Sequence, residues 1–232
     1  FWPGPLTLVV PVGATSRISD LARAGLRSVG LRVPAHPTAH ALLAEAGRPI
    51  AGPSANRSGH VSPVSAEHVI EDLGDKIDLV LDGGVSTIGI ESTIVACLDD
   101  RPRLLRPGGI ARAGIEEVLG TPLTVVDGHA AGGPIAPGML HCHYAPRAAL
   151  RLHATALEPR EAGLDFAGRF APGENVLDLS ADGDTMEAAA NLYTYLRRLD
   201  ASGAQTIAVA PIPAEGLGEA IRDRLKRAAA PR

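Results

Sequence analysis

Residues 49–63 read PIAGPSANRSGHVSP. The stretch starts apolar, passes through a loop with the short polar side chains Ser54, Asn56, Ser58 and Ser62, and then leads into a helical pattern. A loop of this kind either wraps an anionic ligand with backbone N–H groups and hydroxyls, or is a surface turn rich in turn-forming residues. Both interpretations stay open from these residues alone. The order of strand, loop and helix is the first indication of an α/β fold.

Composition limits the classes of protein that the chain can represent. Its 232 residues are 45% hydrophobic, which is enough for one large domain or two small ones with a buried core. The net charge is -4, with arginines scattered among acidic residues. This balance does not provide the broad basic face that tight, sequence-independent nucleic-acid binding needs. We therefore expect direct RNA binding to be weak or absent.

Cysteine content and hydropathy indicate a cytoplasmic location. Cys97 and Cys142 are far apart and form no C-x-x-C pair, so neither a disulfide framework nor a zinc ribbon is expected. No apolar run reaches the length of about 18 residues that spans a bilayer, so we expect no membrane segment. The chain begins with Phe1 rather than Met, and we expect it to be the interior of a longer protein.

Apolar periodicity predicts a mixed sheet with helices in the first half of the chain. We expect strands at residues 6–12, 28–34, 48–52, 77–84, 91–98 and 103–110. We expect helices at residues 37–47, 62–74 and 112–120, the second with Ser62 as its N-cap and Pro63 in its first turn.

The second half of the chain changes character twice. Gly, Pro and His replace periodic apolar residues in a segment that we assign as a linker, residues 125–147. Strand and helix patterns then alternate at residues 175–180, 184–203, 205–213 and 216–229, which is typical of a small parallel α/β unit. The predicted domains are therefore residues 1–124 and 148–232.

Several side chains are candidates for binding a ligand. Arg32 and Arg106 lie at strand ends, where a guanidinium can make two-point contact with a carboxylate or phosphate, or can simply be solvated. Ser92 belongs to a second short hydroxyl cluster at the start of a strand. Metal binding by His141 and His143 has little support, because zinc needs further ligands.

The ordered motifs together resemble one family. FWPGPLT, RVPAHP, PIAGPSANRSGHVSP, DLGDKIDLVLDGG, GIESTIV, LLRPGGI, PGMLHCHYAP and GLGEAIRDRLKRAA follow one another as in the two-domain threonylcarbamoyl-AMP synthases. The resemblance implies a YrdC-like domain with a twisted mixed sheet, followed by a small Rossmann-like domain, and thus an α/β (α+β) fold class. It covers nearly the whole chain.

The resemblance also implies an activity and a set of contacts. The enzyme would be a nucleotidyltransferase that forms L-threonylcarbamoyladenylate and pyrophosphate from L-threonine, bicarbonate and ATP with Mg2+, supplying the machinery that modifies adenosine 37 of tRNA. It implies no metal ligand from protein side chains and no catalytic residue beyond the binding residues. The implied ATP contacts are Ser28, Ser54, Ser62, Arg106 and Tyr144. The implied L-threonine contacts are Arg32, Gly52 and Ser92.

Three departures and two rival functions accompany this interpretation. The family's N-terminal segment, with another threonine contact and a Lys/Arg pair, is absent, Gly52 replaces the usual Ala, and Val64 replaces the usual Thr. One rival is a carbamoyl-adenylate enzyme of hydrogenase maturation, whose zinc-finger-like cysteine pairs this sequence lacks. The other is a double-stranded RNA or tRNA-binding module of the same fold without catalysis, against which the acidic balance argues.

Overall fold

The computed structural model describes residues 1–126 and 143–231. These residues divide into two units that alternate along the chain. The first unit comprises Phe1–Pro53 together with residues 91–126, and the second comprises Ser54–Ile90 together with residues 143–231. Much of the predicted linker lies outside the described residues, and the predicted domain boundaries at residues 124 and 148 stay predictions. The predicted α/β class is confirmed, because a mixed and a parallel sheet are both present.

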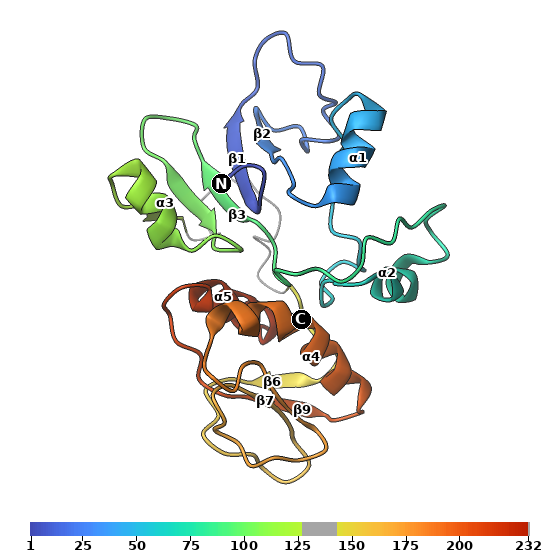
Figure 1. Cartoon of the computed structure of the whole chain (residues 1–232), viewed down its shortest axis with the longest axis vertical. Helices are drawn as coiled ribbons and strands as arrows, with labels where there is room; N and C mark the ends of the chain where they lie inside the picture. The colour runs from blue at the N-terminus through green and yellow to red at the C-terminus, as the bar shows by residue number, and fades with distance from the viewer. Residues whose placement is uncertain (127–142, 232) are drawn as a thin grey trace. The chain divides into compact units, whose positions relative to one another are not determined.

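The first unit is built on a five-stranded mixed sheet of order β2-β1-β3-β4-β5 (Figure 1). Its strands are β1 Leu6–Pro11, β2 Ser28–Leu31, β3 Thr93–Ala96, β4 Arg103–Arg106 and β5 Thr124–Val125. β1 pairs antiparallel with β2 and parallel with β3, and β3 pairs antiparallel with β4. The unit also contains the helices α1 Pro37–Ala46 and α3 Arg112–Leu119.

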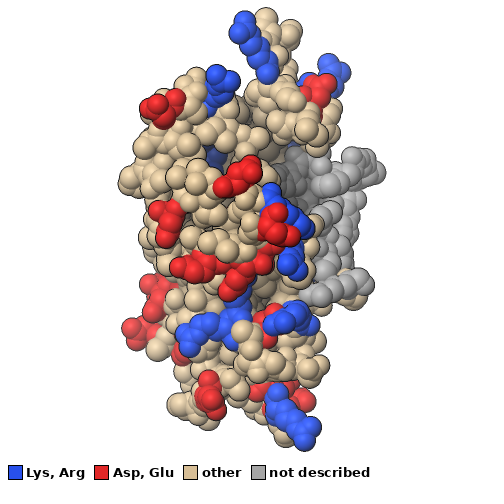
Figure 2. All heavy atoms as spheres, turned by 90° about the vertical axis from the view of Figure 1, so that its right-hand side faces the viewer, with Lys and Arg blue, Asp and Glu red and all other residues tan. Residues whose placement is uncertain are grey.

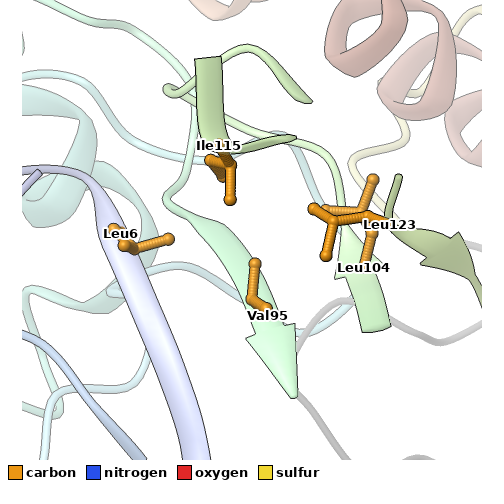
Figure 3. Packing of buried hydrophobic residues seen from close by; sticks show 5 residues of the cluster. All are labelled: Leu6, Val95, Leu104, Ile115 and Leu123. Carbon is orange, nitrogen blue, oxygen red and sulfur yellow. The ribbon is translucent and has the colours of Figure 1, made fainter. Parts of the chain in front are cut away.

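Helix α3 packs on one face of this sheet. Strand alternation sends Leu6, Val95 and Leu104 to that face, because successive side chains of a strand point to opposite sides. Ile115 of α3 and Leu123 complete the cluster, whose members are all less than 9% exposed (Figure 3). The opposite face carries a second cluster formed by Val9, Ile94, Ala96 and Leu105.

The second unit contains a parallel four-stranded sheet of order β6-β9-β7-β8, as expected for a Rossmann-like unit. Its strands are β6 Ala149–Arg151, β7 Ala162–Asp165, β8 Val176–Asp178 and β9 Thr206–Val209. Two helices, α4 Thr185–Ala201 and α5 Gly218–Ala228, lie over one face of this sheet (Figure 1). Leu192 and Leu196 of α4 and Ile221 of α5 are almost fully buried there.

Helix α2, Ala66–Leu73, also belongs to the second unit, and its start differs from the prediction. Its N-cap is Ser65, whose hydroxyl accepts a hydrogen bond from the His68 backbone N–H, so the prediction of Ser62 as the N-cap was wrong. Residues 48–52 and 77–84 form no strand, against prediction, while β5, β6 and β7 were not predicted. No helix of the described residues is long and apolar enough to cross a bilayer.

Candidate ligand-binding site

Three of the eight predicted site residues lie on one face of the first unit's sheet, the face opposite α3. Ser28 is paired with Pro11, and Thr7 is paired with Ile94, so the odd-numbered residues of β1 share a face with Ser28 and Ile94. Arg32 directly follows β2 and is exposed. We call this side, with Ser28, Ser92 and Arg106, the site face.

Ser92 and Arg106 are joined directly on the site face. The Arg106 guanidinium donates to the Ser92 backbone carbonyl through Nη2 (2.9 Å) and Nε (3.2 Å), and to the Ser92 Oγ through Nη2 (3.2 Å). The Ser92 hydroxyl also forms a 2.7 Å hydrogen bond with the Thr7 hydroxyl. A predicted threonine contact and a predicted ATP contact therefore form one polar cluster, which includes Thr7, a residue that the sequence did not single out.

A β-bulge aims Arg106 toward the site face. Val95 is paired with Leu104, but Ile94 is paired with Arg106, so Leu105 is an extra residue in β4. Without this insertion, strand alternation would place Arg106 on the same face as Leu104, against α3. Arg106 is 6% exposed, so its position is fixed by packing as well as by the hydrogen bonds to Ser92.

Arg32 and Gly52 are exposed residues of the first unit. The chain beyond Arg32 is held to the segment that precedes β1, because the Gly4 N–H donates to the Val33 carbonyl (2.8 Å). Gly52 lies in the irregular segment after α1, with open space where a Cβ would stand. The structure records no contact that ties Gly52 to Arg32 or Ser92.

The predicted ATP contacts Ser54, Ser62 and Tyr144 belong to the second unit. Ser54 is exposed and Ser62 is buried, at the two ends of the loop singled out in the sequence. Asn56 organises that loop, since its amide donates to the carbonyls of Arg57 (2.9 Å) and His60 (3.1 Å).

Tyr144 is a buried residue that connects this loop to the helices of the second unit. Its ring, 1% exposed, stacks at 5.8 Å on Tyr193 of α4 and has the Arg224 guanidinium 5.1 Å from its centroid. The next residue, Ala145, forms a parallel bridge with His60, and its N–H donates to the Gly59 carbonyl (2.9 Å). The loop and the chain at Tyr144 are thus held together.

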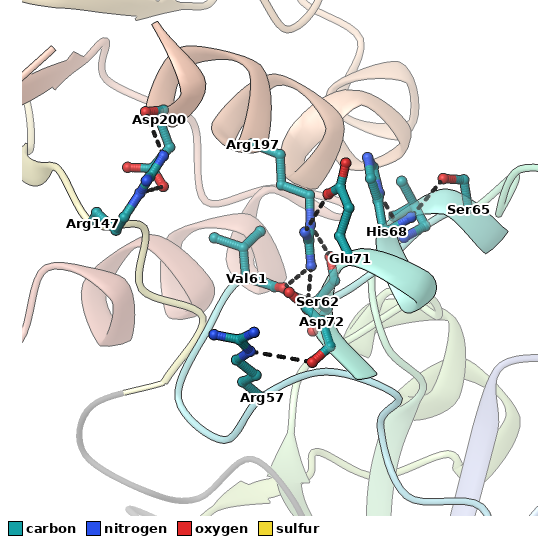
Figure 4. A network of polar contacts seen from close by, with 11 residues as sticks. Arg57, Val61, Ser62, Ser65, His68, Glu71, Asp72, Arg147, Arg197 and Asp200 are labelled. Carbon is teal, nitrogen blue, oxygen red and sulfur yellow. Dashed lines mark hydrogen bonds and ion pairs between the residues drawn. The ribbon is translucent and has the colours of Figure 1, made fainter. Parts of the chain in front are cut away.

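Sequence reasoning missed Arg197 of α4, which contacts the same loop. Its Nη2 donates to the Val61 carbonyl (2.8 Å), and its Nε donates to the Ser62 carbonyl (3.4 Å) (Figure 4). It also forms an ion pair with Asp72 of α2 (2.7 Å). These partners are more than 120 residues away along the chain, so no local pattern could have indicated them.

His68, beside this network, gives a prediction for pH dependence. Its Nδ1 accepts a hydrogen bond from the Val64 N–H (3.3 Å), so that nitrogen must be unprotonated. Burial, followed by the charge of Arg197, lowers the pKa of His68 below its ordinary 6.5, although Glu71, Glu67 and Asp72 oppose the shift. Because the unfolded chain then binds the proton more tightly, stability should fall as the pH drops below about 6.5.

The His68→Asn variant tests this assignment by thermal unfolding between pH 8 and pH 5. Asparagine keeps an acceptor close to the Nδ1 position but does not titrate. The variant should unfold near the wild-type temperature at pH 8 and lose less stability than the wild type at pH 5. Parallel unfolding curves for the two proteins across this range would contradict the role of His68.

The described residues also contain a pocket of about 200 Å³ in the second unit. It is lined by the residues around the start of α2 and by residues 80–86, and none of the predicted site residues lines it. The described residues contain no group of three or more His, Cys, Asp or Glu side chains that could hold a metal ion.

Fold and site residues together define a class: an α/β protein with a YrdC-like mixed sheet, an arginine–serine cluster on one sheet face, and a small parallel α/β unit. Two family models match the chain accordingly. A model described as telomere recombination matches residues 1–108, and the model of the threonylcarbamoyl-AMP synthase C-terminal domain matches residues 110–230.

Curated relatives and solved structures extend the match to nearly the whole chain. The threonylcarbamoyl-AMP synthase of Bacillus subtilis is 41% identical over 99% of this chain and 70% of its own length. That of Pyrococcus abyssi is 38% identical over 98% of this chain and 71% of its own length. The crystal structure of P. abyssi Sua5 complexed with L-threonine has a TM-score of 0.88 at 35% identity, covering 99% of this chain and 71% of that one. The chain belongs to the threonylcarbamoyl-AMP synthase family, whose members are transferases of tRNA modification.

Proposed function

We propose that the protein is an L-threonylcarbamoyladenylate synthase that uses L-threonine, bicarbonate and ATP and releases pyrophosphate. The observation that carries this proposal is the match, across 99% of the chain, to a Sua5 structure complexed with L-threonine. In this reaction the carbamate oxygen of N-carboxythreonine attacks the α-phosphorus of ATP, and the bond to the leaving pyrophosphate breaks. The protein is thus a nucleotidyltransferase.

L-Threonine would bind on the first unit through Arg32, Ser92 and Gly52. Arg32 is exposed at a strand end, where its planar guanidinium can pair with the substrate carboxylate through two hydrogen bonds. The Ser92 hydroxyl, already oriented by Thr7 and Arg106, is suited to a polar group of the same substrate. The exposed backbone at Gly52 leaves room for close approach of the ligand.

ATP would be contacted by Ser28, Arg106, Ser54, Ser62 and Tyr144. Hydroxyls and a guanidinium can donate hydrogen bonds to phosphate oxygens, and they stabilise the charge that develops at the α-phosphoryl group. A solved P. abyssi Sua5 structure is a double variant in which a histidine and the tyrosine that follows it are alanine. The present sequence contains one such His-Tyr pair, residues 143–144.

Magnesium would enter with the nucleotide. Mg2+ prefers oxygen ligands, and in ATP sites it is usually bound by the substrate phosphates together with one or two carboxylates. It would neutralise phosphate charge during the displacement. The protein's own contribution is to fix the phosphates and the threonine carboxylate through the arginines and hydroxyls named above.

The product would serve the threonylcarbamoyl transferase machinery that modifies adenosine 37 of tRNA in the cytoplasm. Direct RNA binding by a non-catalytic module is the less favoured function. Basic and acidic side chains are interspersed on the face of the described residues seen in Figure 2, so this face offers a polyanion no continuous basic surface.

Pyrophosphate release by the whole protein tests the proposed function. Release should require L-threonine, bicarbonate and ATP together, and the nucleotide product should carry label from 14C-bicarbonate. Filter binding of tRNA across a salt series should give weak binding. Tight, steeply salt-dependent RNA binding without pyrophosphate release would disprove the synthase function and favour the non-catalytic RNA-binding module.

Arg32→Ala should weaken L-threonine binding far more than ATP binding. Loss of a charged hydrogen-bonding partner costs about 2 kcal/mol or more at a partly desolvated site, which is at least roughly thirtyfold in Kd. Calorimetric titration with each ligand separately measures the effect. Arg27→Ala, at the other end of β2, serves as the matched control and should change neither affinity. Equal losses for both ligands in Arg32→Ala would disprove this assignment.

A further inference from the structure

Arg197 joins three elements of the second unit at a single guanidinium. Besides the Val61 and Ser62 carbonyls and the Asp72 carboxylate, it has Glu71 within 3.6 Å (Figure 4). The side chains of Arg197 and Asp72 are only 15% and 14% exposed. Helix α4 is therefore linked through one side chain to the loop that ends at Ser62 and to the C-terminal part of α2.

The geometry suits arginine in particular. The planar fork presents donors in several fixed directions at once, so one residue can satisfy two backbone carbonyls and a carboxylate together. Partial burial removes competing water, and the lower local dielectric constant strengthens these hydrogen bonds. Arg57 strengthens the same arrangement, because its Nε donates to the Asp72 carbonyl (3.2 Å) and thus ties the loop to the end of α2.

We propose that Arg197 is a positioning residue for ATP, which fixes the backbone at Ser62 so that the loop presents its hydroxyls to the nucleotide. The inference rests on the proposed function, in which Ser54 and Ser62 contact ATP. It gives the C-terminal α/β unit a definite task in the reaction: its helix α4 sets the geometry of the nucleotide loop. Arg197 acts through Ser62 and does not itself touch the substrate.

This role predicts a selective effect on one substrate. The carbonyls that Arg197 holds belong to the loop of the predicted ATP contacts. The predicted threonine contacts Arg32, Gly52 and Ser92 belong to the first unit, whose described contacts do not include Arg197. A purely structural role would instead lower stability and weaken both ligands alike.

The experiment compares Arg197→Met with Arg147→Met in the whole protein. Arg147 contacts Asp200 at the C-terminal end of α4 (3.1 Å) but contacts neither the loop nor α2 in the described structure, so it is a matched control (Figure 4). Arg197→Met should raise the Kd for ATP about tenfold, the size of effect expected from losing one or two hydrogen bonds. The Kd for L-threonine should stay within about twofold, and Arg147→Met should leave both values unchanged.

A double-mutant cycle with Ser62→Ala tests whether Arg197 acts through the loop. In the Ser62→Ala background, Arg197→Met should weaken ATP binding by less than about threefold, because the contact that it orients is already gone. If Arg197→Met fails to fold, Arg197→Lys replaces it, since lysine keeps a cation beside Asp72 but cannot span both carbonyls. Its ATP affinity should still fall while the L-threonine affinity holds.

Two results would overturn the inference. One is an equal change, or no change, in both affinities in a folded Arg197 variant, and the other is a full tenfold effect that adds independently to Ser62→Ala. Failure of the proposed function would look different, because the wild-type protein would then bind neither ATP nor L-threonine and release no pyrophosphate.

Discussion

Gly108→Ala should lower the free energy of unfolding by about 3 kcal/mol, the upper end of the roughly 1–3 kcal/mol that overpacking costs. A Cβ at Gly108 would lie 2.4 Å from the Glu91 carbonyl oxygen, 2.4 Å from the Ser92 carbonyl carbon and 2.5 Å from the Thr93 nitrogen. These are backbone atoms and cannot rotate away. The substitution should also displace Ser92, the residue that Arg106 holds, so threonine binding should weaken with stability.

Denaturant unfolding with a matched alanine variant measures this effect. Gly114 lies inside α3, where a Cβ would meet only a Phe1 ring atom at 3.9 Å. Gly114→Ala should therefore raise stability by about 0.5–1 kcal/mol, because glycine is unfavourable inside a helix. Wild-type stability in Gly108→Ala would show that β3 and the chain at Gly108 can separate without cost.

Arg106→Met should reduce kcat/KM for adenylate formation by about a hundredfold or more. The side chain is buried and is anchored by its hydrogen bonds to Ser92, so its charge is fixed at the position proposed for the phosphates. Removing a desolvated charged partner costs about 2–5 kcal/mol, which corresponds to roughly 30-fold to several thousand-fold. Arg106→Lys should restore little, because an ammonium cannot reproduce the planar two-point geometry.

Arg103→Met is the control for this measurement. Arg103 begins the same strand and forms an exposed i, i+4 ion pair with Asp99 (2.9 Å), which contributes at most about 1 kcal/mol. Its kinetics should match the wild type under initial-rate conditions with each substrate varied. If Arg103→Met and Arg106→Met show the same rates, Arg106 is not part of the reaction site.

Local sequence signals predicted helices whose capping residues lie at their ends. The helices predicted at residues 37–47 and 184–203 are present: Gly47 ends α1 in the left-handed conformation, and Asp184 caps α4 by accepting a hydrogen bond from the Met186 N–H (2.7 Å). The Ser62 N-cap was wrong because Ser65, three residues on, offers the same hydroxyl at the true helix start. Two serines three residues apart make a sequence-based helix start ambiguous.

Strand predictions were wrong where hydrogen-bond pairing with other strands, rather than the local sequence pattern, decides whether a strand forms. Residues 77–84 contain the apolar run Leu79–Leu81, but Leu79 and Leu81 are exposed, and no described strand lies beside them to form ladder hydrogen bonds. In contrast, β7 reads Ala-Gly-Leu-Asp, a weak strand sequence that forms because β9 and β8 flank it. The neighbouring strands come from distant segments of the chain, so a local sequence pattern does not show them.

The sequence predicted the site residues at strand ends, but it did not predict the residues and the bulge that position them. Arg32 and Arg106 were recognised as arginines at strand ends, but the bulge at Leu105 that sends Arg106 to the site face depends on the register with β3. Arg197 looked like an ordinary helix residue, and only the folded chain brings it to Val61 and Ser62.

The alternation of the two units along the chain governs how the protein can be made. Residues 54–90 leave the ribosome well before α4, although Arg197 holds the end of their loop and Gly89 packs so closely on the backbone of Ala189 and Ala190 that a Cβ would not fit. During synthesis about a hundred further residues must be made before these partners of the segment appear, and until then the segment is exposed to proteases and prone to aggregation. No single cut in the polypeptide separates the two units, so expression of an isolated half should yield a fragment that depends on chaperones.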